Sequence, residues 1–204
     1  MALLNKQQLD QLAESVRNVE KVTDAELVTV LAHASDDYHY IPTLWAALIA
    51  LLTPAVMSFS PFWLDWFELV VLQFSIFLLV AVVFRIPMLR YRLVPAKIKK
   101  LRAGMMARRM FLEQGLHHTK GETGVLIFVS EAEHYVEVLV DRGISEKIDN
   151  QVWQSIVNDF TADVKAGAVQ KGFETCIASV AEVVSDVVPA TEEKNELPDR
   201  LILI

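Results

Sequence analysis

Two long stretches of this chain lack charged side chains altogether. No Asp, Glu, Lys or Arg occurs between Tyr40 and Asp65, and none occurs between Glu68 and Arg85. Each stretch, as a helix, is long enough to cross the hydrocarbon core of a bilayer. The alternative is a pair of buried core helices, but two such runs in succession are unusual in a soluble domain of this size. The sequence therefore predicts a two-helix transmembrane hairpin at residues 41–84.

Cysteine and the common catalytic motifs are also scarce. The chain has one cysteine, Cys176, which excludes an intramolecular disulfide and a CxxC pair. It contains no phosphate-binding loop and no nucleophile–base motif. We expect no secretory leader, because the first apolar run begins near residue 41. Candidate chemistry must therefore come from the polar residues of the soluble-looking sequence on either side of the hairpin.

A third stretch lacks acidic residues. Residues 85–109 carry nine Lys and Arg side chains and no Asp or Glu, whereas residues 110–190 carry 13 acidic against 5 basic side chains. Basic flanks of membrane helices stay in the cytoplasm, and the 60–68 loop has no Lys or Arg. We therefore expect an integral protein of a bacterial inner membrane, with both termini cytoplasmic.

The basic residues have two interpretations. Their position beside a membrane helix predicts contact with the lipid bilayer and its anionic headgroups. Alternatively, they dock onto an acidic partner or onto the acidic 110–190 region of the same chain. Nucleic acid is not an expected partner, because the soluble part of the chain is acidic. The candidate lipid contacts are Arg85, Arg90, Arg92, Lys97, Lys99, Lys100 and Arg102.

The sequence on both sides of the hairpin predicts an ordinary soluble domain. Residues 4–18 have apolar residues at helical spacing, and Asn5 with Gln8 resembles a capping box. The run Glu26–Ser35 has the composition of a buried strand. After the hairpin, a long helix ending near Gly115 is predicted, with one apolar face formed by Val94, Ile98, Leu101, Met105, Leu112 and Leu116.

Two strands and two helices follow. TGVLIFVSE and AEHYVEVLVD are predicted strands joined by a short hairpin. Asp149 is the predicted cap of a helix that ends at Gly167, and an amphipathic last helix comes after it. Three strands with flanking helices make a layered α/β domain, into which the hairpin is inserted. The predicted divisions are residues 1–38, 41–84, 85–188 and 189–204, the last being a charged tail.

The stretch from TGVLIFVSE to the last helix resembles the TPM domain family. The matching positions are Gly124, Gly143, Asp149, Gly167 and Gly172, and residues 4–35 resemble the family's opening helix and strand. The resemblance implies a three-layer α/β/α sandwich, here interrupted by the transmembrane hairpin. It also implies a range of activities, because relatives include acid phosphatases, proteins that bind divalent metal through clustered acids, and assembly or repair factors. The chain departs from the pattern at Ala168, where relatives often carry an acid.

Four aspartates are the candidate metal ligands, namely Asp36, Asp37, Asp141 and Asp149. If the predicted strands are parallel neighbours, these acids converge and suit Ca²⁺ or Mg²⁺. Arg142 is the candidate phosphate-binding residue. The same aspartates are also good turn and cap residues, and Arg142 can simply pair with an acid. His33, His117 and His118 are expected to pack or end a helix, not to bind metal.

These observations predict a membrane-anchored, cytoplasm-facing TPM-like domain that serves as an interaction or assembly module. Its expected partner is a membrane or membrane-associated protein. Small residues in the spans, Ala46, Ala47, Ala50 and Ser75, would permit close helix packing. The alternative is a divalent-metal-dependent phosphatase, in which Ca²⁺ or Mg²⁺ would be the cofactor.

Overall fold

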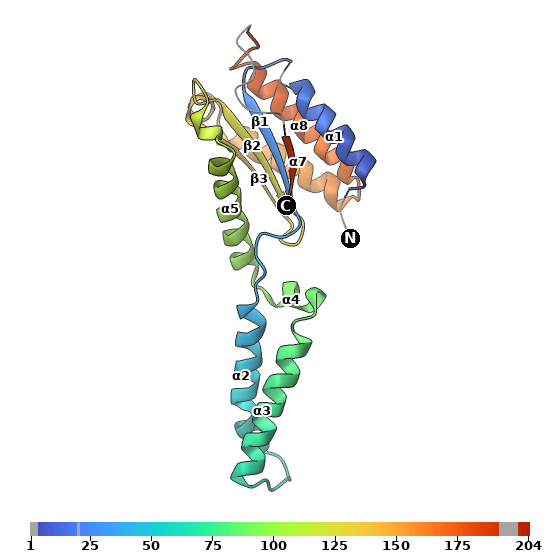
Figure 1. The fold of residues 1–204 in the computed structure, drawn as a ribbon, viewed down its shortest axis with the longest axis vertical. Helices are drawn as coiled ribbons and strands as arrows, with labels where there is room; N and C mark the ends of the chain where they lie inside the picture. The colour runs from blue at the N-terminus through green and yellow to red at the C-terminus, as the bar shows by residue number, and fades with distance from the viewer. Residues whose placement is uncertain (1–3, 20, 192–199) are drawn as a thin grey trace. The chain divides into compact units, whose positions relative to one another are not determined.

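The computed structural model describes residues 4–19, 21–191 and 200–204. The chain divides into two compact units. The α/β unit comprises Met1–Ser35 and Lys100–Ile204, and the hairpin unit comprises Asp36–Lys99. The hairpin unit therefore interrupts the α/β unit in the sequence, after the first strand (Figure 1).

Four strands form the sheet of the α/β unit, in the order β3-β2-β1-β4. β1 (Glu26–Ala32) pairs in parallel with β2 (Gly124–Ser130), and β2 pairs antiparallel with β3 (Tyr135–Val140). The predicted hairpin between the second and third strands is therefore confirmed. The expectation of three strands was incomplete, because β4 (Arg200–Leu203) pairs in parallel with the other edge of β1. The rest of the predicted charged tail, residues 192–199, lies outside the described residues.

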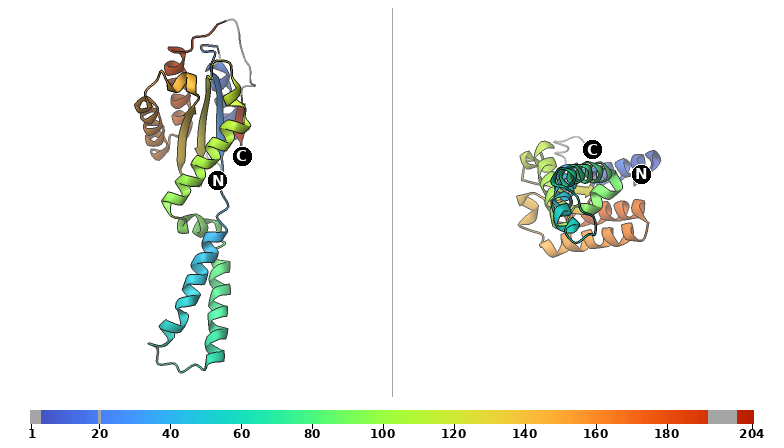
Figure 2. Two further views of the ribbon diagram at one scale, coloured as in Figure 1. Left: turned by 90° about the vertical axis from the view of Figure 1, so that its left-hand side faces the viewer. Right: turned by 90° about the horizontal axis from the view of Figure 1, so that it is seen from below.

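Helices cover both faces of the sheet (Figure 2). Successive residues of a strand point to opposite faces. In β1, Leu27 and Leu31 join a core beneath three helices, whereas Val28 and Val30 join a core beneath one helix. The predicted three-layer α/β/α sandwich is therefore confirmed. The single helix is α5 (Ala96–Glu113), and the three are α1 (Lys6–Val19), α7 (Asn150–Lys165) and α8 (Val169–Ser185).

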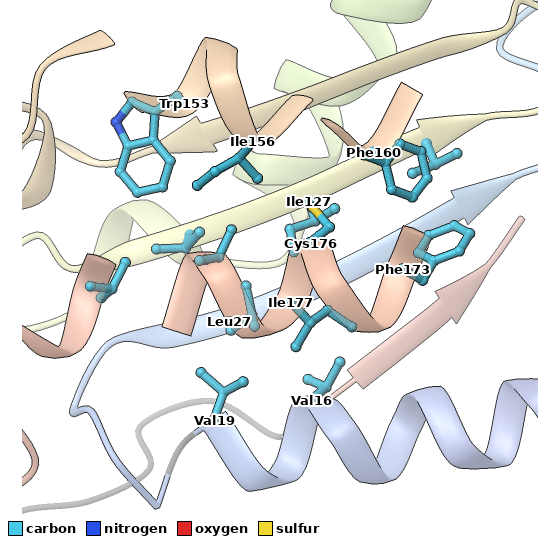
Figure 3. Close-up of a cluster of buried hydrophobic side chains, with 14 of the residues drawn as sticks. Val16, Val19, Leu27, Ile127, Trp153, Ile156, Phe160, Phe173, Cys176 and Ile177 are labelled. Carbon is cyan, nitrogen blue, oxygen red and sulfur yellow. The ribbon is translucent and has the colours of Figure 1, made fainter. Parts of the chain in front are cut away.

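The larger core lies between the sheet and the three helices (Figure 3). Phe160 of α7 meets Phe173 of α8 edge to face, with ring centroids 4.9 Å apart. Cys176 lies in the same core, and burial raises the pKa of its thiol to about 12. Such dense packing joins α7 and α8 to the sheet and places α7 beside β3.

Local sequence signals explain several element boundaries. The capping box at α1 is confirmed, since Asn5 N donates to Gln8 Oε1 (2.8 Å) and Gln8 N donates to Asn5 Oδ1 (2.9 Å). Asp149 caps α7 as predicted, and Gly167 follows it in the left-handed region, with φ 81°. A side chain at Gly124 would overlap the backbone of Leu116, so the close approach at the start of β2 requires glycine.

The helix after the hairpin is interrupted, which the sequence analysis did not predict. α4 (Pro87–Leu93) ends before Val94, which is extended, and α5 begins after Pro95. Proline lacks a backbone donor and disfavours helical geometry in the residue before it, so the break at Val94 has a local cause.

The predicted apolar face of this helix was wrong in part: Val94 and Leu116 are buried, but Leu101, Met105 and Leu112 are not. The buried residues of α5 are Ala103, Gly104, Ala107 and Met110. Leu101, Met105 and Leu112 are instead 59%, 51% and 58% exposed. Large strand side chains such as Phe128 already fill this layer, so only small residues let α5 approach the sheet. A Cβ on Gly104 would lie 3.2 Å from the hydroxyl of Tyr135, which shows how close the approach is.

The hairpin unit consists mainly of α2 (Tyr40–Met57) and α3 (Trp66–Val83). Both helices are long and apolar enough to cross a membrane. Ala46, Ala50 and Thr53 are the buried residues in the middle of α2, spaced along one face, whereas α3 has no buried residue. α3 begins with a capping box formed by Asp65 and Glu68. Two further short elements, the 3₁₀ turn η1 (Leu116–His118) and the helix α6 (Arg142–Ser145), belong to the α/β unit.

Candidate functional site

The four candidate aspartates do not meet at one edge of the sheet. β3 runs antiparallel to β2, so Asp141 lies at the amino end of β2, where its N–H donates to Gly124 O (2.9 Å). The residues after β1 leave from the opposite, carboxyl end of the parallel strands. Convergence of Asp141 with these residues required a parallel third strand, so that expectation was wrong. Asp36 and Asp37 belong to the hairpin unit.

Three of the four aspartates bond to nearby backbone. One carboxylate oxygen of Asp36, Asp141 and Asp149 accepts from an N–H one or two residues further along, at 2.8 Å in each case. Asp37 is exposed, with Oδ2 3.8 Å from Nε2 of His39. Asp141 differs from the others, because its Oδ2 is buried and has no hydrogen-bond partner in the part of the chain that the structure describes. Asp141 is thus the candidate with an unused acceptor.

The remaining candidates have structural roles in the described residues. Arg142 Nε donates to Glu146 Oε1 (2.7 Å), one helical turn further along. The exposed rings of His117 and His118 contact each other in η1, with centroids 3.8 Å apart and ring planes inclined at 44°. Within residues 4–19, 21–191 and 200–204, no three His, Cys, Asp or Glu side chains are grouped to hold one metal ion.

A buried polar cluster at the carboxyl ends of β1 and β2 was not predicted. Ser35 Oγ donates to Ser130 Oγ (2.9 Å), and Ser130 Oγ donates to the carboxylate of Glu133. Ser35 N donates to the same carboxylate at 3.1 Å. These bonds satisfy a buried acid and connect β1 to the β2–β3 turn. The sequence carries no signal for them, since isolated Ser and Glu residues near turns are common.

The basic residues after the hairpin are largely open to solvent. Arg85, Arg92, Lys97 and Lys100 are exposed. Arg90 is half-buried, with its guanidinium 5.0 Å from the ring centroid of Tyr91. Lys99 and Arg102 are also half-buried. The exposed members are accessible to headgroups or to an acidic partner, and which of the two they contact stays a prediction.

β3 forms one edge of the sheet and leaves half of its backbone groups outside the ladder. Backbone groups along an antiparallel strand point alternately toward and away from the partner. The Asp141 N–H points to β2, so the groups of alternate residues back along β3 point there too. The outward N–H and C=O groups are those of Val136, Val138 and Val140.

A groove with a volume of about 520 Å³ runs along this edge. It is lined by all of β3 and by Asn150, Trp153, Gln154 and Val157 of α7. Trp153 is only 4% exposed, and its buried indole Nε1 has no hydrogen-bond partner among the described residues. Figure 3 shows this nitrogen on the side of the ring that faces away from Ile156. Asn150 and Gln154 are exposed, so the groove combines an open backbone edge with a wall of mixed polarity.

Glu137 is the one charged side chain among the residues that line the groove. Its carboxylate accepts a hydrogen bond from the hydroxyl of Tyr135 (2.9 Å). Burial, followed by this hydrogen bond, raises the pKa of the Tyr135 phenol. Tyr135 therefore stays neutral at physiological pH and donates to Glu137 on the face of β3 that packs on α5.

The outer face of α5 is a second unusual surface. Leu101, Met105 and Leu112 are exposed at spacings that place them along one side of the helix. A shallow pocket of about 300 Å³ continues this surface to β3, lined by Arg108, Phe111, Leu112, Leu139 and Val140. We call the stripe of Leu101, Met105 and Leu112 the α5 apolar stripe.

Comparisons with known proteins agree with this architecture. Residues 93–183 match the family model described as the TPM domain. Among solved structures, the chain is similar to the BA42 protein from the psychrophilic bacterium Bizionia argentinensis, with a TM-score of 0.61 and 15% sequence identity. That match covers 98% of this chain and 94% of the other, and at this identity it shows a shared fold. No curated protein matches the chain.

Proposed function

We propose that this chain, in which residues 93–183 match the TPM domain, is a membrane-anchored interaction module. The α2–α3 hairpin anchors it in a bacterial inner membrane, and the α/β unit faces the cytoplasm and binds a membrane or membrane-associated protein.

The anchoring part of the proposal is supported by α3. This helix is almost entirely apolar, yet none of its residues is buried in the protein. Exposed to water, such a surface is unfavourable by about 25 cal/mol for each Å² of apolar area. A lipid bilayer covers it without any further protein contact.

The orientation is supported by the distribution of Lys and Arg around the hairpin. Residues 85–109 carry nine basic side chains, and the turn between α2 and α3 carries none. Fusions of alkaline phosphatase and of a cytoplasmic fluorescent reporter at Met1, Phe62 and Ile204 test this orientation. Phosphatase activity at residue 62 alone is the expected result, and activity at either terminus contradicts it.

The α5 apolar stripe carries the interaction part of the proposal. Folded soluble domains rarely leave three large apolar side chains in line on the outside of one helix, and such surfaces mark protein contacts. Exposed Arg108 falls between Met105 and Leu112, which gives a partner with acidic residues a charge to pair with.

Site-specific photo-crosslinking in native membranes tests the stripe. A photoreactive amino acid at Met105 should crosslink to a discrete membrane protein, whereas the same group at exposed Glu174 on α8 should not. The Met105 crosslink should disappear in a Leu101→Glu, Leu112→Glu variant that remains folded. It should also disappear when the hairpin is replaced by a flexible linker. Equal crosslinking from both positions contradicts the proposal.

One observation favours the alternative function, a divalent-metal-dependent phosphatase. Asp141 has a buried, unpartnered carboxylate oxygen, and such an oxygen suits Ca²⁺ or Mg²⁺. The discriminating experiment is hydrolysis of a phosphomonoester with each ion. Metal-dependent turnover that is abolished by Asp141→Asn, and is unaffected by replacing the hairpin, would rank the enzyme above the interaction module.

A further inference from the structure

The free edge of β3 offers an ordered set of hydrogen-bonding groups. The outward N–H and C=O groups of Val136, Val138 and Val140 form three donor–acceptor pairs at the end of the sheet. Unpaired strand edges are templates for another extended chain. An added strand would gain main-chain hydrogen bonds along this edge and would complete the ladder.

The groove beside this edge would receive half of the side chains of such a strand. Side chains of an extended peptide alternate, so every second one would face α7. There it would meet the exposed side chains of Asn150 and Gln154 and the half-buried Val157. The valine side chains of β3, which pack on the larger core, lie next to them. β-branched side chains, whether apolar or bearing a hydroxyl, fit this mixed wall.

The charges around the groove favour a basic occupant. Glu137 lies in the middle of β3, and a Lys or Arg opposite it on the added strand would form a cross-strand pair. Asp141 adjoins the end of β3, and Asp149 adjoins the start of α7. Of the nearby cations, Arg142 is already bonded to Glu146. Arg108 of α5 lies beside β3 and acts on Tyr135, so it offsets part of this negative charge.

We propose that β3 accepts, as a fifth strand of the sheet, an extended basic segment of another protein. β-branched side chains of this segment face α7, and a Lys or Arg lies opposite Glu137. The inference rests on the proposed interaction function, and it specifies a second contact surface and the chemistry of the segment that binds there.

A second copy of this chain fits the edge less well. Pairing two β3 strands about Val138 would bring two Glu137 side chains together. It would also bring together two domains in which residues 110–190 carry 13 acidic and 5 basic side chains. Repulsion between like charges opposes this arrangement.

Peptide binding to the full-length protein in lipid nanodiscs tests the proposal. The probe is a fluorescein-labelled peptide with blocked ends and the sequence Thr-Val-Lys-Val-Lys-Val-Thr, followed by fluorescence polarisation. A peptide with Glu in place of Lys should bind at least about threefold more weakly, since each cross-strand charge pair has a modest effect. N-methylation at alternate residues removes the N–H donors from one side of the peptide. A peptide methylated on the side that faces β3 should therefore not bind.

Two variants of the protein test the edge and the groove separately. Val138→Pro removes an outward N–H but no bond to β2, so edge pairing is blocked while the ladder remains. Gln154→Trp fills the groove from an exposed position on α7. Each should weaken peptide binding at least about tenfold. For Val138→Pro this corresponds to the loss of one or two main-chain hydrogen bonds, and for Gln154→Trp to exclusion of the peptide side chains from the groove. The matched controls are Val138→Ala, which keeps the N–H, and Gln151→Trp, which is exposed on α7 away from the groove.

The outcomes separate this inference from the proposed function. Weaker binding in Val138→Pro and Gln154→Trp, with both controls unchanged, supports strand addition. If Val138→Pro does not fold, Gln154→Trp against Gln151→Trp decides the question. No binding of the lysine peptide by the wild type overturns the proposal, and so does concentration-dependent dimerisation lost in Gln154→Trp. If the Met105 crosslink persists while the peptide fails to bind, the interaction function stands and the strand-addition site is wrong.

Discussion

The two units of this chain place their apolar side chains in opposite ways. In the α/β unit, β1 and β2 are buried along their whole lengths. In the hairpin unit, α3 is almost entirely apolar, yet none of its residues is buried in the protein. The hydrophobic effect removes both surfaces from water, by protein packing in one case and, as we propose, by lipid in the other. Apolar content alone therefore does not distinguish a core from a lipid-facing surface.

The α5 apolar stripe lies outside both patterns. Its side chains are exposed, as those of α3 are, but they occur on a helix whose other face packs on the sheet. Basic residues interrupt the stripe at Arg102, Arg108 and Arg109, so the helix is not suited to span a bilayer. We propose that a protein contact covers it, which is why the stripe carries the proposed function.

The largest expected difference concerns cysteine reactivity. Cys176 is buried in the core, and burial raises the pKa of its thiol from 9.0 to about 12. Because only the thiolate reacts, alkylation at pH 8 should be slower by about a thousandfold or more than in a Cys176→Ala, Thr175→Cys variant, whose thiol is exposed. Mass spectrometry of the labelled protein measures both rates. Similar rates would mean that the core of the α/β unit is open to solvent.

The same pKa shift predicts a loss of stability in alkaline solution. The folded protein keeps the Cys176 proton up to about pH 12, whereas the unfolded chain releases it near pH 9. The unfolded state therefore binds fewer protons between these values, and the free energy of unfolding falls as the pH rises through this window. The Cys176→Ala variant should lack this part of the pH dependence.

Two phenylalanines test the contrast in packing. Phe128 of β2 is fully buried, whereas Phe74 of α3 is 65% exposed. Phe128→Ala should lower the free energy of unfolding of the α/β unit by about 3–5 kcal/mol, through lost burial and a cavity. Phe74→Ala should change it by less than about 0.5 kcal/mol. Hydrogen exchange of the β1 and β2 amides measures this unit alone. A large effect of Phe74→Ala would show that the two units unfold together.

Two leucines of similar exposure test whether lipid or water surrounds the helix that carries them. Leu78 of α3 is 61% exposed, and Leu112 of α5 is 58% exposed. An arginine near the centre of a membrane helix costs about 2.5–3.5 kcal/mol on the insertion scale. Leu78→Arg should therefore shift the protein toward the carbonate-soluble fraction, while Leu112→Arg should leave it in the membrane. Identical fractionation of the two variants would contradict the lipid-facing assignment of α3.

Two capping boxes, one in each unit, give the smallest expected effect. Asn5→Ala removes the cap of α1 and should destabilise the α/β unit by about 0.5–2 kcal/mol. Asp65→Ala removes the cap of α3 and should leave the urea midpoint of the α/β unit unchanged. Near-ultraviolet circular dichroism across a urea titration distinguishes the two. Equal shifts would again mean that the units are coupled.

Features set by neighbouring residues were the ones that sequence analysis predicted well. The Asn5–Gln8 box, the Asp149 cap and the end of α7 at Gly167 each depend on a few residues in succession. The strand predicted in AEHYVEVLVD is β3, and its side chains alternate, since Val136, Val138 and Val140 pack on the larger core and Tyr135 and Leu139 on the smaller one. These signals need no knowledge of the rest of the fold.

Sequence analysis missed the features that depend on which residues, distant in the chain, pack against an element. The face of α5 was misassigned, because Leu101 and Met105 match a core pattern better than Ala103 and Ala107 do. The acids were expected together, but the direction of β3 places Asp141 at the other end of the sheet from the residues that follow β1. β4 was missed because four apolar residues after a charged stretch give no periodicity to read.

By itself, the sequence of this protein determined the two apolar spans, the basic flank and the layered α/β class, since these follow from composition and short-range periodicity. Only the tertiary structure decided that small residues of α5 face the sheet, that Ser35, Ser130 and Glu133 meet, and that β3 keeps a free edge above a groove. The reason is physical: helix caps and strand alternation depend on neighbours in the chain. Burial, close approach and strand direction depend instead on the space left by residues distant in sequence.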